Sequence, residues 1–245
     1  MDRRLEECLS GTVADKSATD QNAYLQRVSH LLAEGIPYTD VLVLVHGDVS
    51  GTAERLEQAA ITFSMLTYEQ LLSTEEAEAI SECGAIVVPF STEMPLDARE
   101  RLDELAYGGI LVFFVGDEPV ATDENGLIFE GYGPVITVLP ADLSGMIRIF
   151  GHAHFTPSRK YSALRFRHLI RTGTDVFLFL NTSSRSIGFC FDAGRTDVLL
   201  YDPMENRLFS PEIRNGKIRV QIRAGASLFA IGEGHSEEYP KFKYR

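Results

Sequence analysis

Five consecutive branched aliphatic residues occupy positions 41–45, between two segments whose apolar residues recur at helical spacing. A run that is apolar at every position predicts a strand buried on both faces, as in parallel sheets covered by helices. Residues 61–66, 85–89 and 110–115 are predicted to form further strands, with helices between them. This alternation predicts right-handed crossovers and a flavodoxin-like three-layer α/β domain.

The hydrophobic pattern changes from about residue 126. Short strand-like segments then follow one another, separated by turn sequences such as Asn215-Gly216. The expected strands are 127–139, 146–150, 164–170, 175–181, 186–191, 197–201, 217–222 and 227–231. Many short strands at this spacing, without helices, predict an all-β antiparallel sandwich.

The charge distribution supports a division into two domains. Residues 1–141 carry 7 Lys and Arg against 25 Asp and Glu, a net charge of −18, whereas residues 142–245 carry 16 against 10, a net charge of +6. We expect a leader at 1–20, the flavodoxin-like α/β domain at 21–141 and the β-sandwich domain at 142–245. The α/β domain is expected to begin with a helix that carries Tyr24 and Val28 at apolar positions.

The composition excludes several classes of protein. With 44% hydrophobic and 24% charged residues, the chain is predicted to be globular and soluble. No apolar run approaches the roughly 20 residues that cross a bilayer, and no signal peptide is recognisable. Three cysteines without metal-ligand spacing favour a cytoplasmic location. The arginines of the second half are spread along strands rather than clustered, so nucleic-acid binding is not expected.

The loop after the run at 41–45 is the first candidate for a ligand site, because open α/β sheets bind ligands at the carboxyl ends of their strands. Its polar residues are His46, Asp48, Ser50 and Thr52. Hydroxyls and glycines between a strand and a helix can hold a phosphate, as flavodoxins do for their flavin. The same residues equally suit a turn with a helix cap. The loops after residues 88 and 115 offer no Trp or Tyr to flank a flavin ring, so no cofactor is expected.

Other residue types give weaker signals. His152 and His154 could contact one zinc ion from one face of a strand, but no third ligand is identifiable. Cys83 precedes its strand and lacks the small neighbours of a nucleophile elbow. Asn181 is the first residue of an Asn-Thr-Ser triplet, which matches the N-glycosylation motif but equally suits a turn at the end of a strand. Trp is absent, which disfavours a sugar-binding platform, although Tyr132, Tyr161 and Tyr201 keep one possible.

Acidic residues are abundant in the first domain, but no pair suited to glycoside cleavage can be assigned. They lie mainly on predicted helices, as in residues 100–104, Glu-Arg-Leu-Asp-Glu. A solvent-exposed helix face is the expected place for such residues. No catalytic residue is therefore predicted.

Three stretches together resemble the C-terminal region of large glycoside hydrolases of the alpha-L-rhamnosidase and beta-galactosidase type. Residues 24–35 with 40–44 resemble the helix and first strand that follow the catalytic barrel. Residues 85–89, 101–105 and 108–112 are similar to the rest of a flavodoxin-like or trimerisation-type domain. Residues 164–168, 175–181 and 201–203, the last reading Tyr-Asp-Pro, resemble the closing β-sandwich.

The resemblance covers roughly residues 21–232 and implies a non-catalytic accessory module of a glycoside hydrolase. These enzymes carry their acid and base carboxylates on a (β/α)8 barrel, which this chain lacks, so no catalytic residue is carried over. The implied partners are the catalytic domain or sister subunits, and possibly carbohydrate. A stand-alone protein that binds phosphate or flavin, or a carbohydrate-binding module, remains the alternative, and whether the chain is an enzyme stays open.

Overall fold

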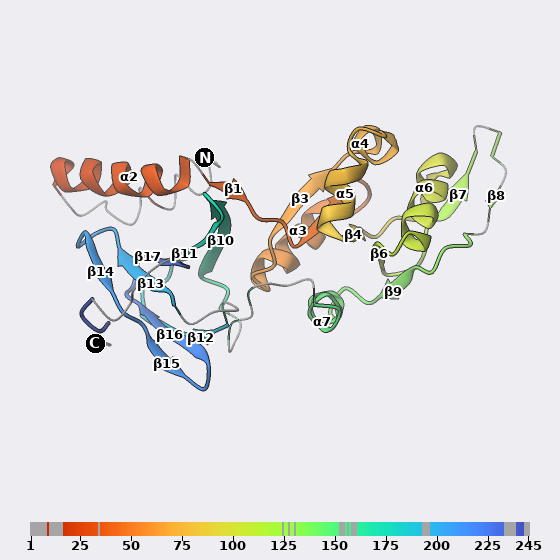
Figure 1. Ribbon diagram of the computed structural model, residues 1–245. Helices are drawn as coiled ribbons and strands as arrows, with labels where there is room; N and C mark the ends of the chain where they lie inside the picture. Colours follow the sequence, from red (N-terminus) through yellow and green to blue (C-terminus); the bar gives the residue numbers. More distant parts are fainter. Residues whose placement is uncertain are drawn as a thin grey trace. The chain divides into compact units, whose positions relative to one another are not determined.

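The chain folds into two compact units in a computed structural model (Figure 1). The described residues are 9, 17–33, 35–123, 125–126, 128–129, 131–151, 155, 157, 161–192, 197–232 and 239–242. One unit consists of residues 39–153, and the other combines residues 1–38 with 154–245. The chain therefore begins and ends in the same unit, and the α/β unit is an insertion in it.

The α/β unit is built on five parallel strands, which confirms that the sheet is parallel. In spatial order these are β3 (Phe63–Leu66), β2 (Val41–Leu44), β4 (Ala85–Val88), β6 (Leu111–Val115) and β9 (Ile136–Val138). After β2 the chain adds β3 on one side of it, and then adds β4, β6 and β9 in turn on the other side. The direction in which strands are added therefore reverses between β2 and β4.

Helices cover both faces of this sheet. They are α3 (Val49–Gln58), α4 (Tyr68–Leu72), α5 (Ala77–Cys83), α6 (Leu96–Tyr107) and α7 (Leu143–Ile149). Alternate residues of β2 point to opposite faces, so Val41 and Val43 pack with α3 and α7, whereas Leu44 packs with α4, α5 and α6. This explains why β2 is apolar at every position, whereas Val45, which ends the run, is 44% exposed.

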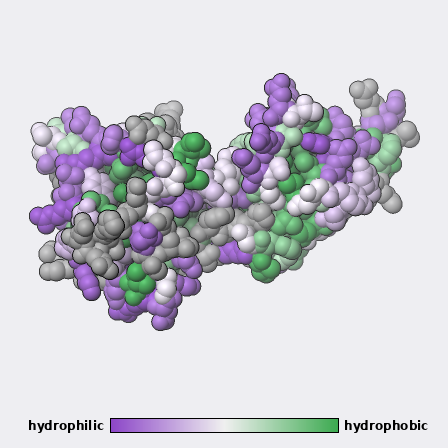
Figure 2. Space-filling model, in the orientation of Figure 1, coloured by the Kyte–Doolittle hydropathy of each residue, from purple (hydrophilic) through white to green (hydrophobic). Residues whose placement is uncertain are grey.

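A small sheet adjoins α6. Its strands are β5 (Glu93–Pro95), β7 (Val120–Thr122) and β8 (Ile128–Phe129); β5 and β7 are parallel, and β7 and β8 antiparallel. In Figure 2 the helices α4 and α6 present mainly hydrophilic residues, whereas apolar residues are visible around α7, where Ile149 and Phe150 are exposed.

The β-rich unit contains two antiparallel sheets. The first has the order β1 (Ile36–Pro37), β10 (Leu164–Arg171), β11 (Thr174–Asn181), β17 (Ser227–Ile231), β13 (Leu199–Asp202) and β14 (Arg207–Phe209). The second has the order β12 (Ile187–Phe191), β16 (Lys217–Ile222) and β15 (Glu212–Arg214). The rings of Phe177 and Phe179 contact the ring of Phe191, with centroids 5.9 and 5.1 Å apart, so the core lies between the two sheets.

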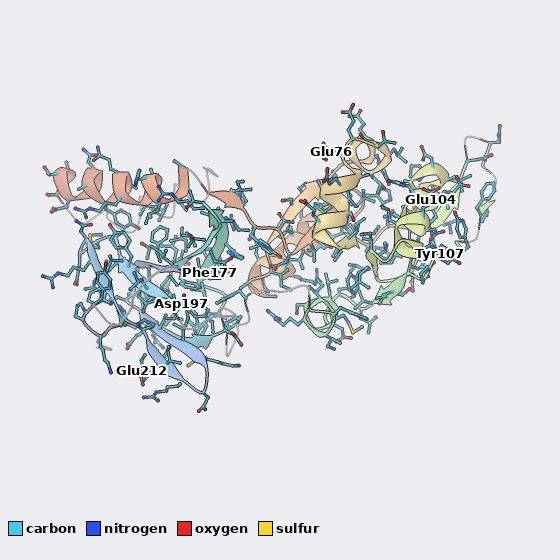
Figure 3. All side chains as sticks on the ribbon, viewed as in Figure 1. Glu76, Glu104, Tyr107, Phe177, Asp197 and Glu212 are labelled. Atoms are coloured by element: carbon cyan, nitrogen blue, oxygen red, sulfur yellow. The ribbon has the colours of Figure 1, made fainter. Side chains whose placement is uncertain are left out.

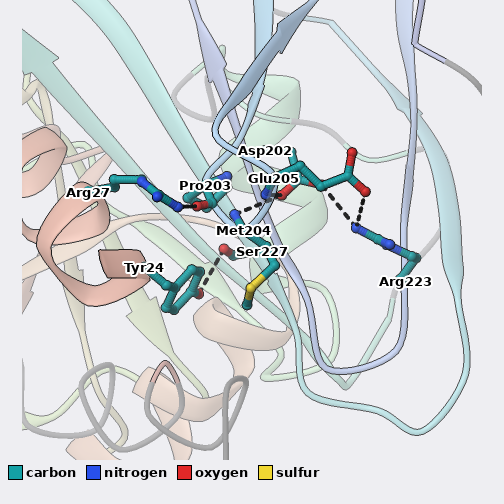
Figure 4. Close-up of polar contacts among 8 residues, drawn as sticks. All are labelled: Tyr24, Arg27, Asp202, Pro203, Met204, Glu205, Arg223 and Ser227. Atoms are coloured by element: carbon teal, nitrogen blue, oxygen red, sulfur yellow. Dashed lines mark hydrogen bonds and ion pairs between the residues drawn. The ribbon is translucent and has the colours of Figure 1, made fainter. Parts of the chain in front are cut away.

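The N-terminal helix α2 (Ala18–Ala33) packs in the β-rich unit, not at the start of the α/β domain as predicted. Its buried residues Tyr24 and Val28 belong to a core cluster with residues of β10, β11 and β17. The Tyr24 hydroxyl shares a buried 2.9 Å hydrogen bond with the Ser227 hydroxyl, and Arg27 donates to the Pro203 carbonyl at 2.8 Å (Figure 4). Strand β1 then pairs with β10, so both α2 and β1 belong to this unit.

A second correction concerns residues 142–153. The segment predicted as a strand at 146–150 is mostly helix α7, whose Leu143 and Ile147 pack against the parallel sheet. A short run of apolar residues fits either structure, because packing against the sheet, and not the run itself, decides between them. The α/β unit therefore extends to residue 153 instead of ending at 141.

Candidate functional site

The predicted ligand loop lies where the strand order reverses, at the carboxyl ends of β2 and β4. Open α/β sheets place ligands at this point because the two loops diverge there. In this protein the loops are joined: the Asp48 backbone N–H donates to the Phe90 carbonyl at 2.9 Å. A Cβ on Gly47, which has φ +62°, would lie 2.1 Å from the Phe90 oxygen. Only glycine permits this approach, so the crevice is bridged by backbone at this point.

His46 is half-buried and contacts the segment after β4. Its Nε2 lies 2.6 Å from the Glu93 carbonyl oxygen, which also accepts a hydrogen bond from the Ser91 hydroxyl. A carbonyl can only accept, so His46 must carry a proton on Nε2. Its ring meets the Tyr68 ring edge-on, with centroids 5.4 Å apart.

The Tyr68 side chain is held close to the apolar core. Its hydroxyl oxygen is buried and has no hydrogen-bond partner among the residues that the structure describes. Burial, together with the negative charge of Asp97, raises the pKa of Tyr68 to about 12. The phenol therefore stays protonated beside His46 at neutral pH.

The other three predicted residues have different roles. Asp48 is the N-cap of α3, and its carboxylate accepts from the Gly51 N–H at 3.0 Å. This confirms the helix-cap alternative for Asp48. Thr52 is buried and donates its N–H to the Asp48 carbonyl, whereas Ser50 is exposed. Several N–H groups that a phosphate would use are therefore engaged within the chain, and a ligand at the four residues stays a prediction.

A buried charged cluster on α6 was missed by sequence reasoning. The guanidinium of Arg99 contacts the Asp103 carboxylate at 3.1 Å and the Glu118 carboxylate at 2.9 Å. It also lies over the Phe114 ring, 4.9 Å from its centroid. Asp103 is buried, although residues 100–104 were expected to form a solvated face. The Arg99–Asp103 spacing of four was the available signal, but oppositely charged pairs at this spacing also form on exposed helix faces.

The remaining candidates carry no site in the described residues. His152 and His154 lie outside the described residues, and within those described no group of three or more His, Cys, Asp or Glu could hold a metal ion. Burial raises the pKa of the Cys83 thiol, which disfavours a reactive thiolate. The Asn181 side chain is fully buried; its amide donates to the Arg185, Ile222 and Arg223 carbonyls, so it organises a strand end.

Comparison with known proteins identifies solved structures of similar fold. No family model and no curated protein sequence matches the chain. A rhamnosidase from Novosphingobium sp. PP1Y is similar over 93% of this chain and 26% of its own, with a TM-score of 0.66 and 15% identity. A beta-galactosidase from Bacillus circulans sp. alkalophilus matches 86% of this chain and 44% of its own, with a TM-score of 0.59 and 10% identity.

Alpha-L-fucosidase isoenzyme 2 from Paenibacillus thiaminolyticus is also similar, over 86% of this chain and 51% of its own, with a TM-score of 0.56 and 10% identity. The fold is thus one that occurs within glycoside hydrolases. The chain spans between about a quarter and a half of the length of these three proteins. Among the described helices, none is long and apolar enough to cross a membrane.

Proposed function

We propose that this chain is a non-catalytic accessory module of a glycoside hydrolase, composed of a flavodoxin-like unit and a β-sandwich. The observation that carries the proposal is the pattern of coverage. The similarity to the rhamnosidase extends over 93% of this chain, and therefore over both units, yet takes up 26% of the rhamnosidase. The strand order β3-β2-β4-β6-β9, with all neighbours parallel, supports the flavodoxin-like assignment.

Three carboxylates among the described residues have roles that fit a non-catalytic module. Glycosidases need a carboxylic acid whose pKa is raised, positioned near a second carboxylate. Asp48 caps a helix, and Asp103 is ion-paired in the protein interior. Hydrogen bonding to Arg214, together with the charges of Arg214 and Arg219, lowers the pKa of Glu212, which is opposite to what a general acid requires.

The proposed partners follow from the same comparison, in which this chain matches only 26% of the rhamnosidase. In this proposal the catalytic groups belong to a barrel domain or to sister subunits, which contact the module. The module would contribute to assembly or to one wall of the active site.

The test is an activity assay of the purified chain on aryl rhamnosides, aryl galactosides and aryl fucosides. The Novosphingobium rhamnosidase serves as a positive control, and heat-inactivated chain gives the background. We expect no turnover above this background. Turnover that co-purifies with the chain and is lost when one of its own Asp or Glu residues is replaced would overturn the proposal.

A further inference from the structure

Two exposed tyrosines lie together at the carboxyl end of α6 and on the loop before β9. Tyr107 is 66% exposed and Tyr132 is 56% exposed. Their rings are stacked, with centroids 5.9 Å apart and an interplanar angle of 24°. The Tyr107 hydroxyl donates to the Tyr132 carbonyl at 2.8 Å. Figure 3 labels Tyr107 below Glu104 on the same helix. We call these two side chains the tyrosine pair.

The buried charged cluster fixes the backbone of the tyrosine pair. The Tyr132 N–H donates to the Asp103 carboxylate at 3.0 Å. The other carboxylate oxygen of Asp103 contacts Arg99, which Glu118 also holds. Burying such charges is costly and adds little stability compared with apolar residues of the same volume. The cluster is therefore better explained by the position it imposes on the loop.

Two glycines allow the loop to approach this cluster closely. A Cβ on Gly131 would lie 1.6 Å from the Arg99 guanidinium, whose two carboxylate partners restrict its movement. A Cβ on Gly133 would lie 2.7 Å from the Asp103 Cα atom. The residues on both sides of Tyr132 thus approach α6 closely, which fixes the backbone that carries the ring.

An exposed aromatic pair held in this way is suited to binding, because little conformational entropy remains to be lost when a ligand stacks on it. The surroundings of the rings are polar. The pKa of Tyr132 is raised, mainly by desolvation and to a smaller extent by the negative charges of Asp103, Glu104 and Glu100. On α6, Glu100, Glu104 and Tyr107 are all exposed and follow one another at spacings of four and three residues, so their side chains share one face of the helix. The two carboxylates on this face can accept hydrogen bonds from hydroxyl groups.

We propose that the tyrosine pair is a surface binding site for a neutral oligosaccharide. The C–H faces of a pyranose would stack on the rings, and its hydroxyls would donate to the exposed carboxylates of Glu100 and Glu104. The choice of a sugar over other neutral polyols rests on the proposed function. Arg101 pairs with one carboxylate oxygen of Glu104 at 3.0 Å, which reduces the attraction of this face for a cationic segment and leaves the other oxygen able to accept from a hydroxyl.

The test titrates galacto-, rhamno- and fuco-oligosaccharides into the full chain at millimolar concentration, with tyrosine ring resonances followed by NMR. A glycan array of neutral sugars extends the panel. We expect ring shifts for both tyrosines with at least one sugar. Tyr107→Ala and Tyr132→Ala should each weaken binding by tenfold or more, because each removes a stacking face. Tyr132→Phe, which keeps the ring, should retain most of it.

Ile149→Ala is the matched control, since Ile149 is an exposed apolar residue of the same unit on a helix that covers the opposite face of the sheet. It should bind sugar like the unmodified chain. Far-UV circular dichroism verifies that each variant is folded. Failure of every sugar to bind, binding that survives both alanine variants, or binding of a tri-arginine peptide at the pair instead would each overturn the inference. None of these results alters the activity assay on which the proposed function depends.

Discussion

Replacement of Asp103 by alanine tests whether the buried charged cluster is coupled to the loop it contacts. The Arg99 and Asp103 side chains are 4% and 1% exposed, whereas Glu118 is 42% exposed. Removing one partner of a buried pair costs roughly 3–5 kcal/mol, because the other charge loses its compensation. Here Glu118 still contacts Arg99 but shares its charge with solvent, so we expect a loss near the lower limit, about 3 kcal/mol.

For a unit of this size, such a loss lowers the midpoint of thermal unfolding by roughly 10 °C. The chain has no Trp, so far-UV circular dichroism reports the transition. Hydrogen exchange adds a local measurement: amides of α6 and of residues 131–133 should lose protection in Asp103→Ala, because the Tyr132 N–H loses its acceptor.

The double variant Arg99→Met with Asp103→Leu separates stability from positioning. Replacing both charges by apolar side chains of similar size removes the desolvation cost, so most of the lost stability should return. Protection of residues 131–133 should not return, since the acceptor for Tyr132 is still missing. A stability of Asp103→Ala within about 1 kcal/mol of the unmodified chain, or full protection in the double variant, would refute the reasoning.

Three further changes have expected outcomes. Gly47→Ala should destabilise the α/β unit by about 2 kcal/mol or more, because the added Cβ would meet the Phe90 oxygen. Gly126→Ala is the control: Gly126 has φ +75° but nothing within 4 Å of an added Cβ, so this change should cost only about 1 kcal/mol. Urea denaturation measures both. Phe179→Ala should destabilise the β-rich unit by about 3–5 kcal/mol, since Phe179 is fully buried between the sheets, and a loss below 1 kcal/mol in the same measurement would contradict this. The pKa of Tyr68 is raised from 10.0 to about 12, so the stability that the protonated phenol contributes is complete below pH 10 and is lost as the pH rises towards 12. Ultraviolet titration should show a phenol that ionises near pH 12 and is missing in Tyr68→Phe.

The strands could be predicted because the pattern that defines them is local. The run at 41–45 is apolar throughout, as a strand covered on both faces must be, and it contains β2 (Val41–Leu44). Residues 217–222 alternate between buried and less buried positions, and they form β16 with the predicted bounds. Both predictions needed no knowledge of distant residues.

The place of α2 could not be predicted, because its apolar spacing is the same whichever sheet it covers. Tyr24 and Val28 indicate one buried face, but the sheet beneath them comes from residues more than 130 positions later. The same limit applies to Asp103, whose burial depends on the loop around Tyr132. For the candidate site, the cap at Asp48 was foreseeable from its position before a helix, whereas the Phe90 carbonyl that meets its N–H was not.

The two corners of the α/β unit differ in how their polar groups are used, and this bears on where a ligand is to be sought. At the end of β2, the Asp48 N–H and carboxylate and the His46 ring all bond to neighbouring backbone, so a ligand there would have to replace existing hydrogen bonds. At α6 the bonds of Asp103 are buried behind the loop, and the rings of Tyr107 and Tyr132 stay exposed. A ligand at the rings would displace only water, which costs less than breaking internal hydrogen bonds. The surface at α6, and not the sheet edge that usually carries the site in this architecture, is therefore the better place to look for binding.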